Sequence, residues 1–442
     1  MRRFAAVLLG AATLLHANLL PAENWPQFRG PHFNGSSGEK NLPVKFSRTE
    51  NVAWVAALPG AAAATPAIWG DRVFVSSTDA ESKSLVALCL DRLSGKLLWQ
   101  HKVADGLSQD SRSNYASPSP ATDGQRVIFF YGNGELAAFD LAGQKLWGRN
   151  LQHDYGEFAF QWTFSTSPLL YQDKLYMQVL QRNEPARGRG AKGGKSESYL
   201  LALDPASGKE LWRHVRPSQA VAESLEAFST PVPWENAGRT ELLIVGGDDI
   251  SGHDPATGQE LWRWGTWNPS RIGHWRLVPS PVAGGGVILA CAPKGDPIYA
   301  VKAGGTGRLA DDQLAWVTRD DKSLTTDVPT PAFADGDFFV LSDVRKSLCR
   351  VDPKTGRARW QFKTPGLAKY EASPLVADGK VYLINFVGDV VVVDAATGQQ
   401  LALVSLDDPA DDAVRSSIVA SGGQLFIRVN RKLYCIGQPA RS

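Results

Sequence analysis

The sequence shows no marked excess of charge of either sign. Its 442 residues carry 47 Lys and Arg against 45 Asp and Glu, a formal net charge of +2 at pH 7. A protein that binds nucleic-acid phosphates or an anionic membrane surface with its whole body carries a clear basic excess. The balance therefore excludes these two classes of partner for the chain as a whole.

Long apolar runs are missing after the N-terminus. The apolar run over residues 4–15 is shorter than the about 20 residues that a membrane-spanning helix needs. Arg2 and Arg3 precede it, and Ala17 and Ala22 follow it, which is the pattern of a secretory signal. We predict a cleaved signal peptide over residues 1–22 and a periplasmic or secreted protein, with an uncleaved anchor as the alternative.

Cysteine is scarce, and the four residues are far apart in the sequence. The sequence contains no C-x-x-C and no C-x-x-C-H, which argues against haem attachment, a zinc site or a redox dithiol. Cys89 and Cys435 fall at equivalent places in the first and last repeats described below, so a disulfide between them is one alternative. Small buried thiols packed in strands are the interpretation we favour.

Motifs of catalysis are also missing. The sequence has no Ser/His/Asp spacing, no phosphate-binding glycine loop before a helix and no His/Glu metal motif. We therefore name no catalytic residue and predict no metal site.

What the sequence does contain is a repeated turn that ends in tryptophan. Its form is small-x-Asp-x-x-x-Gly-x-x-x-Trp, and the clearest copy runs from Ala202 through Asp204 and Gly208 to Trp212. Asp suits the start of a tight turn because its carboxylate accepts backbone N–H groups, and Gly supplies a positive φ. Further copies end at Trp99, Trp147, Trp262, Trp316 and Trp360, and a copy with Asp394 and Gly398 has Ala402 in place of Trp.

Each repeat begins with an apolar strand that follows Ser/Thr-Pro. These starts are at Thr65, Ser117, Ser167, Thr230, Ser280, Thr330 and Ser373, and Ser416-Ser417-Ile418 begins an eighth unit without Pro; their spacing runs from 43 to 63 residues. Short β-branched and aromatic runs between Gly, Asp and Asn turns predict four strands per unit. The period predicts an all-β, eight-bladed β-propeller of four-stranded antiparallel blades.

The predicted ring closes through the N-terminal strand. The eighth unit stops at Gly437 before its fourth strand, and residues 51–54 have the form of the missing strand, including its Trp. Pairing the two ends removes an open sheet edge. We therefore divide the chain into a signal peptide over 1–22, a leader over 23–50, the propeller over 51–437 and a tail over 438–442.

The recurring tryptophans are expected to pack each blade against its neighbour. A buried Trp removes roughly 150 to 250 Å² from water, and regular recurrence favours packing over the alternative of a ligand cage. The predicted docking residues are Trp54, Trp99, Trp147, Trp212, Trp262, Trp316 and Trp360.

The tryptophan motif resembles that of propellers with pyrroloquinoline-quinone-type (PQQ-type) repeats. This family includes the quinoprotein alcohol dehydrogenases and the BamB-like propellers, which are not enzymes. The resemblance covers about residues 50–437, and the leader Trp25-Pro26-Gln27-Phe28-Arg29-Gly30-Pro31 is similar to the opening of exported bacterial PQQ-repeat proteins.

The sequence departs from both branches of that family. The dehydrogenases place two adjacent cysteines beside the quinone and bind calcium through Glu, Asn and Asp, and this sequence has no Cys-Cys and no alignable calcium set. BamB is lipidated on an N-terminal Cys, which the signal region here lacks. We predict no cofactor, with PQQ and calcium as the alternative that the resemblance implies.

Residues just before each Ser/Thr-Pro are expected to line one mouth of the central channel. Their mixture of charge and aromatic character suits a polar ligand, a quinone or a peptide, and the alternative is a merely solvated rim. Within this set, Trp275 between His274 and Arg276 is the candidate for stacking a planar ligand. The predicted rim residues are Arg112, Asn114, Tyr115, Trp162, Glu226, His274, Trp275, Arg276, Asp327, Tyr370, Glu371 and Arg415.

The third repeat carries a basic, glycine-rich insertion over residues 183–198. It is expected to be a mobile loop between the second and third strands, on the side of the mouth. It either binds an anionic partner or is an inert insertion. Its cations, with the residue before it, are Arg182, Arg187, Arg189, Lys192 and Lys195.

From these observations we predict an exported binding or scaffold protein. One face would hold a protein or an envelope polymer, with no nucleic acid and no transmembrane segment. The alternative is a PQQ-dependent dehydrogenase that oxidises an alcohol or sugar, and a polymer-cleaving enzyme that uses rim carboxylates ranks last.

Overall fold

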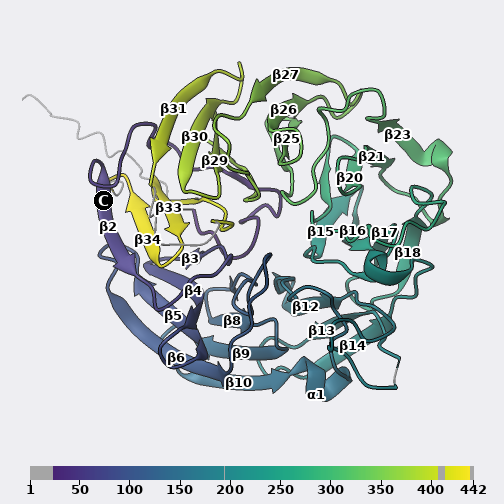
Figure 1. Ribbon diagram of the computed structural model, residues 1–442, viewed down its shortest axis with the longest axis horizontal. Helices are drawn as coiled ribbons and strands as arrows, with labels where there is room; N and C mark the ends of the chain where they lie inside the picture. Colours follow the sequence, from purple (N-terminus) through teal and green to yellow (C-terminus); the bar gives the residue numbers. More distant parts are fainter. Residues whose placement is uncertain (1–22, 194, 407–413, 439–442) are drawn as a thin grey trace, which may run out of the picture.

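The computed structural model describes residues 23–193, 195–406 and 414–438. These residues form eight sheets of four antiparallel strands, arranged as blades around a central axis (Figure 1). The predicted eight-bladed β-propeller is confirmed. The predicted signal peptide over 1–22 lies outside the described residues, and within them no helix is long and apolar enough to cross a membrane.

Blade 1 shows how the sequence builds each sheet. It consists of β3 (Ala67–Trp69), β4 (Arg72–Asp79), β5 (Ser84–Asp91) and β6 (Leu97–Asp105), in that order from the channel outward. The apolar strands β4 and β5 are buried almost throughout, because both of their faces lie against neighbouring blades. The outer strand β6 alternates between exposed and half-buried residues, as expected for a strand with one face in solvent.

Blades 2 to 7 repeat this order. Blade 2 contains β7 (Ala121–Thr122), β8 (Arg126–Phe130), β9 (Glu135–Asp140) and β10 (Lys145–Asn150), and blade 3 contains β11 (Leu169–Tyr171), β12 (Lys174–Val179), β13 (Tyr199–Leu203) and β14 (Glu210–Val215). Blade 4 contains β15 (Val232–Asn236), β16 (Arg239–Gly246), β17 (Asp249–His253) and β18 (Glu260–Trp264), with β22 (Gly307–Arg308) added, and blade 5 contains β19 (Val282–Gly284), β20 (Val287–Cys291), β21 (Ile298–Lys302) and β23 (Leu314–Val317). Blade 6 contains β24 (Ala332–Ala334), β25 (Asp337–Ser342), β26 (Ser347–Val351) and β27 (Ala358–Lys363), and blade 7 contains β28 (Leu375–Ala377), β29 (Lys380–Ile384), β30 (Asp389–Asp394) and β31 (Gln400–Ser405), with β1 (Ser36–Ser37) beside β28.

Helix is confined to short pieces of the loops. These are α1 (Leu151–Tyr155) and the 3₁₀ turns η1 (Ala222–Leu225) and η2 (Asp311–Gln313). Asn150 caps α1 by accepting the amides of Gln152 and His153.

Blade 8 is completed by both ends of the chain. Its inner strands are β32 (Val419–Ser421), β33 (Gln424–Val429) and β34 (Lys432–Ile436), and its outer strand is β2 (Val52–Ala57). Trp54 lies opposite Cys435 in the antiparallel pairing of β2 with β34, and Figure 1 shows these strands side by side. The predicted closure by the N-terminal strand is therefore confirmed.

Six of the joints between described blades share one arrangement. The indole N–H of each outer-strand Trp donates to a backbone carbonyl in the turn of the next blade, and its ring covers the turn glycine. The pairs are Trp54 with Arg92 (2.8 Å), Trp99 with Leu141 (3.2 Å), Trp147 with Pro205 (2.9 Å), Trp212 with Pro255 (3.3 Å), Trp316 with Pro353 (2.7 Å) and Trp360 with Ala395 (3.2 Å).

Within the turn itself, the Asp carboxylate has the expected partners. Asp204 accepts the amide of Ala206 and the hydroxyl of Ser207, each at 2.8 Å. These hydrogen bonds hold the pKa of Asp204 below its usual range. Gly208 takes φ +70 beneath the ring of Trp147, where a Cβ would lie 2.6 Å from the ring.

Two joints depart from this arrangement. Trp262 donates to Glu241 of its own blade at 2.5 Å, and β22 of the following insertion pairs in parallel with β18. At the joint between blades 7 and 8, where Ala402 replaces Trp, Leu42 and Phe46 of the leader belong to the same buried cluster. Trp262 therefore lacks the indole-to-carbonyl hydrogen bond of the six other joints, although its buried ring belongs to one cluster with Ile288 and Val301 of blade 5.

The sequence also placed the start of blade 2 incorrectly. In the other blades the innermost strand begins two residues after the Ser or Thr of the start motif, and β7 begins at Ala121. The equivalent residue is therefore Ser119 and not Ser117. The sequence Ser117-Pro118-Ser119-Pro120 contains the signal twice, so the repeat alone did not distinguish the two.

All four cysteines are unpaired and buried within blades. Burial raises the pKa of the Cys291 thiol to about 12, so it remains protonated at neutral pH. The structure thus contains packed thiols in place of the Cys89–Cys435 disulfide that was the alternative.

Candidate functional site

The leader crosses one end of the central channel, which we call the far end. Trp25 is buried and pairs with Ile68 of blade 1, and the carbonyl of Pro26 accepts the amide of Thr122 of blade 2. Gln27 exchanges two hydrogen bonds with the backbone of Leu170 in blade 3. The leader then continues to blades 6, 7 and 8 before it reaches β2.

Arg29 fixes the second half of this crossing. Its guanidinium donates to the carbonyls of Pro331 (2.8 Å) in blade 6, Pro374 (3.1 Å) in blade 7 and Asn34 (3.3 Å) of the leader. Burial lowers the pKa of Arg29 to about 9, so it remains a cation at neutral pH. Gly35 takes φ +77 beside it, where a Cβ would lie 1.9 Å from the guanidinium.

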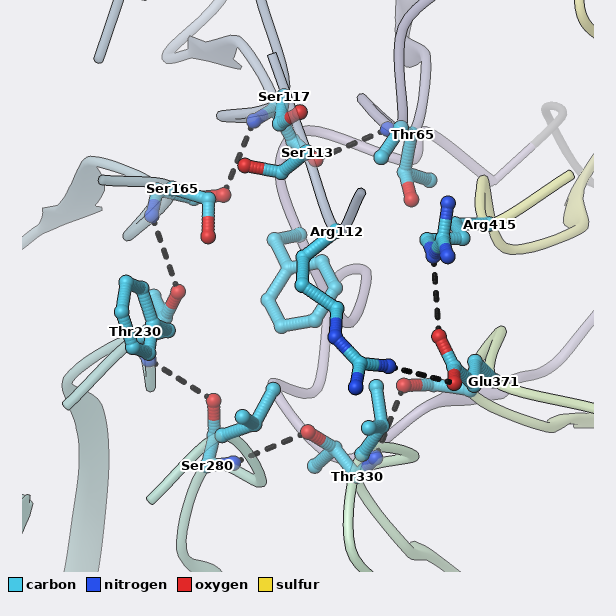
Figure 2. A pocket seen from close by; sticks show the side chains of 18 of the residues that line it. Thr65, Arg112, Ser113, Ser117, Ser165, Thr230, Ser280, Thr330, Glu371 and Arg415 are labelled. Atoms are coloured by element: carbon cyan, nitrogen blue, oxygen red, sulfur yellow. Dashed lines mark hydrogen bonds and ion pairs between the residues drawn. The ribbon is translucent and has the colours of Figure 1, made fainter. Parts of the chain in front are cut away.

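A closed ring of hydroxyl groups surrounds the channel. In each blade the backbone N–H of the Ser or Thr in the start motif donates to the hydroxyl of the same position in the next blade, at 2.9 to 3.3 Å. The last bond, from Ser417 to Thr65, completes the circle. The ring members are Thr65, Ser119, Ser167, Thr230, Ser280, Thr330, Ser373 and Ser417, and Figure 2 shows part of this ring.

All eight hydroxyl-ring residues line one cavity at the channel axis. Its volume is about 930 Å³ including the open mouth, and Phe28 of the leader belongs to its lining. Apolar side chains of the wall are Phe228, Val278 and Val328. The cavity therefore lies between the leader and the opposite end of the channel, which we call the mouth.

Charged side chains from different blades gather at the mouth. Arg415 donates to Glu371 at 3.0 Å, and Arg112 approaches the other oxygen of Glu371 at 4.0 Å. Figure 2 shows the Arg112 side chain extending across the cavity toward Glu371. Arg276 lies 3.5 Å from Asp327 and 3.8 Å from Glu223.

One further carboxylate, that of Asp343, lies behind these pairs. Asp343 is buried, and its Oδ1 accepts the amide of Asp327 at 2.9 Å. Burial is the main reason that the pKa of Asp343 rises to about 6. This carboxylate loses its charge more readily than a solvated one as the pH falls below neutral.

The basic insertion contacts the mouth because Arg187 packs on the ring of Trp162. The guanidinium of Arg187 lies 4.9 Å from the centre of the Trp162 ring, and that of Arg112 lies 5.7 Å from it. The indole N–H of Trp162 donates to Glu223 at 2.9 Å. In the described part of the insertion, Ala186 and Arg189 exchange backbone hydrogen bonds at 2.9 Å.

Glu226 forms a buried pair next to the mouth. Its Oε1 accepts from Nε of Arg182 at 2.5 Å and from the amide of Gln161 at 3.0 Å, while its Oε2 is buried without a hydrogen-bond partner among the described residues. Desolvation outweighs the attraction of Arg182 and raises the pKa of Glu226 to about 7.

Five of the twelve predicted rim residues line the cavity: Arg112, Trp162, Arg276, Glu371 and Arg415. Asp327 is the ion-pair partner of Arg276. Asn114 instead holds a neighbouring loop through the carbonyl of Ala61, and Tyr115 lines an adjacent hollow.

The remaining predicted rim residues lie elsewhere. Trp275 is buried in the core between blades 4 and 5, where its amide donates to Ser224, and His274 beside it is exposed and outside the cavity lining. Tyr370 is buried and donates to the carbonyl of Pro365. Trp275, the candidate for stacking a planar ligand, is thus buried and does not belong to the lining of the cavity, whereas the adjacent Arg276 does.

Sequence reasoning missed the hydroxyl ring and Phe28. The Ser/Thr-Pro signal is present in seven units, but it indicates the start of a strand and not that its hydroxyl lines a cavity. Phe28 lies in the leader, which is not repeated, so no recurrence signals its place in the channel.

Comparisons with known proteins agree with this architecture. The family model described as outer membrane protein assembly factor BamB, one of the PQQ-type repeat models, matches residues 38–183 and 246–441, more than half of the chain. The chain belongs to this PQQ-type propeller family.

One relative and two solved structures are similar to this PQQ-type propeller. A polyvinylalcohol dehydrogenase from a Pseudomonas species is 26% identical over 166 residues, which is 37% of this chain and 24% of that enzyme. A europium-containing methanol dehydrogenase superposes with a TM-score of 0.63 at 12% identity, over 91% of this chain and 89% of its own. BamB from Moraxella catarrhalis gives 0.58 at 14% identity, over 88% and 99%.

We asked whether the mouth fits a quinone with bound calcium, the cofactor that the resemblance implies. Calcium takes about six to eight oxygen ligands, several of them from carboxylates. Among the described lining residues Glu371 supplies the one carboxylate, and it is already paired with Arg415. Over the part of the chain that is described, no group of three His, Cys, Asp or Glu side chains is placed to hold a metal. The residues do not fit the calcium-bound cofactor.

Proposed function

We propose that this protein is an exported, non-catalytic binding protein that holds a protein or polymer partner at the channel mouth. The observation that carries the proposal is the contrast within one cavity. Its wall is a repeated ring of hydroxyls, whereas its mouth combines Arg112, Trp162 and Glu371 from different blades. Unlike side chains that converge on a cavity suit recognition, because a packing role would repeat around the ring.

The basic insertion enlarges the same face. Arg187 contacts Trp162 at the mouth, and the insertion contributes further cations at Arg189 and Lys192. We include an anionic character of the partner in the proposal, since exposed cations raise the local concentration of anions. The likeness to BamB supports a protein partner.

Site-specific photo-crosslinking in the native host tests this proposal. A photoreactive amino acid at Ser111, an exposed residue beside the mouth, should form adducts with a discrete partner. The matched control is Lys354, which is exposed in the hairpin between β26 and β27. Connections between third and fourth strands lie at the far end, because antiparallel strands alternate in direction. Adducts at Lys354 alone, or equal adducts at both positions, would contradict the proposal.

The dehydrogenase alternative has a separate readout. It draws on the 166-residue match to a polyvinylalcohol dehydrogenase. Purified protein is mixed with PQQ and calcium, and quinone absorbance and dye-linked oxidation of alcohols and sugars are recorded. We expect no turnover above that of the free cofactor, and stoichiometric quinone uptake with turnover would replace the binding proposal.

A further inference from the structure

We propose that the mouth binds the C-terminal carboxylate of an extended peptide, end first. This inference rests on the proposed binding function and names its ligand. The four observations that carry it are the obstructed far end of the channel, the incomplete pairing of one arginine, the orientation of the hydroxyl ring and the apolar wall.

Because the leader obstructs the far end, we expect the cavity to bind the end of a ligand chain and not its middle. It bridges blades 1, 2 and 3 to blades 6, 7 and 8 across the far end, and its Phe28 belongs to the cavity lining. A polymer therefore cannot pass through the channel. A ligand that fills the cavity must enter and leave by the mouth, which favours a chain terminus.

The charged side chains of the cavity lining favour an anionic terminus. The charged side chains of the lining are Arg112, Arg276 and Arg415 against Glu371. Arg415 is satisfied by Glu371, and Arg276 lies between Asp327 and Glu223. Arg112 has its nearest carboxylate at 4.0 Å, is 47% exposed and extends over the cavity (Figure 2). Its guanidinium can therefore donate to an incoming carboxylate.

The hydroxyl ring adds donors below Arg112. Each ring hydroxyl accepts a backbone N–H from the preceding blade, which uses its acceptor side. A hydroxyl carries one proton as well as its lone pairs, so each ring member keeps a proton to donate. Converging donors together with a guanidinium are the environment in which a terminal carboxylate is captured.

The wall favours a peptide over an acidic sugar. Phe28, Phe228, Val278 and Val328 offer apolar surface to the side chain of the last residue. The aromatic ring at the mouth, Trp162, is already in contact with the guanidiniums of Arg112 and Arg187, which leaves less of it for stacking on a sugar. The ligand that matches both features is a free α-carboxylate beside an apolar residue.

Fluorescence anisotropy with labelled synthetic peptides tests the inference. The probes are a peptide of Gly and Ser that ends in Ala-Val-Leu with a free carboxylate, the same peptide amidated at its C-terminus, and a hexamer of uronic acid as competitor. We expect the free acid to bind about tenfold more tightly than the amide, the worth of one charge-assisted hydrogen bond. Equal affinity of acid and amide, or displacement by the uronate at lower concentration than by the unlabelled peptide, would overturn the inference.

Substitution identifies the anchor. R112Q should remove the difference between acid and amide, whereas R357Q, at an exposed arginine in the hairpin between β26 and β27, should leave it intact. Thermal melting shows whether each variant is folded. A retained tenfold preference in folded R112Q overturns the role of Arg112. If crosslinking at Ser111 persists while these peptides fail, the carboxylate inference alone is wrong; if both fail, the binding function fails with it.

Discussion

The two ends of the channel are built on different principles. At the far end, one continuous segment brings buried side chains that are bonded to the blades, Gln27 to blade 3 and Arg29 to blades 6 and 7. At the mouth, side chains from separate blades meet, and Arg112 is half-exposed with an incomplete ion pair.

This difference in the bonding of polar groups indicates a different role for each end of the channel. Polar groups that are buried and hydrogen-bonded, as the Arg29 guanidinium is to three carbonyls, stabilise a structure and cost free energy when they are disturbed. A polar group that is partly paired and solvated, as Arg112 is, contributes little stability and remains available to a ligand. The far end is therefore part of the fold, and the mouth is where we propose that a partner binds.

The largest effect should come from the far end. R29A leaves the carbonyls of Asn34, Pro331 and Pro374 without their donor, and we expect the free energy of unfolding to fall by about 3 kcal/mol or more. Urea unfolding measures this loss, with R48A as control because Arg48 is an exposed residue of the leader. A loss below about 1 kcal/mol would show that the leader is not an integral part of the fold.

The next largest loss of stability should come from the tryptophan contacts between blades. W212A removes a ring that covers Gly258 and an indole that donates to Pro255, and we expect a loss of about 2 to 4 kcal/mol. L211A, at an exposed neighbour on β14, should cost little. Equal losses in the two variants would contradict the docking role that we propose for the recurring tryptophans.

A smaller effect on stability, which depends on pH, should come from Glu226 next to the mouth. Because the pKa of Glu226 is raised to about 7 in the folded protein, its contribution to stability is full below the usual carboxyl pKa and is lost as the pH rises through 7. E226Q lacks this titration, so between pH 5 and pH 8 it should gain up to about 3 kcal/mol relative to the natural protein. Melting curves that shift in parallel over this range would show that Glu226 is ionised throughout.

The smallest effect on stability should come from the mouth. R112Q removes a half-exposed side chain, and we expect the free energy of unfolding to change by less than about 0.5 kcal/mol. The same urea titration as for R29A measures it. A loss comparable to that of R29A would remove the distinction between the two ends.

The repeated features of the molecule could be predicted from the sequence, and the unrepeated ones mostly could not. Eight starts, the turn with Asp204 and Gly208, and the missing fourth strand after Gly437 each point to the ring and its closure. Recurrence identifies such positions because each copy occupies the same surroundings. Recurrence did not distinguish Ser117 from Ser119, and it did not indicate that the indole of Trp262 donates to Glu241 of its own blade.

The site depends on geometry that recurrence does not encode. Seven bonds of the hydroxyl ring join residues 43 to 63 positions apart, and the eighth joins Ser417 to Thr65 across 352 positions, which nothing local indicates. Whether a loop residue faces the channel, as Arg276 does, or the core, as Trp275 does, depends on the path of one loop. The role of Phe28 depends on where a non-repeating leader crosses the ring.

Selective blocking of the two ends tests the central claim most directly. The four native cysteines are buried, so a cysteine introduced at an exposed position can be labelled alone with a long polyethylene glycol maleimide. We would place one at Ser111 beside the mouth and another at Lys40 of the leader, both exposed. The account predicts that the polymer at position 111 abolishes binding of the free-acid peptide, while the polymer at position 40 leaves its affinity unchanged. Loss of binding from position 40, or full binding with position 111 blocked, would contradict it.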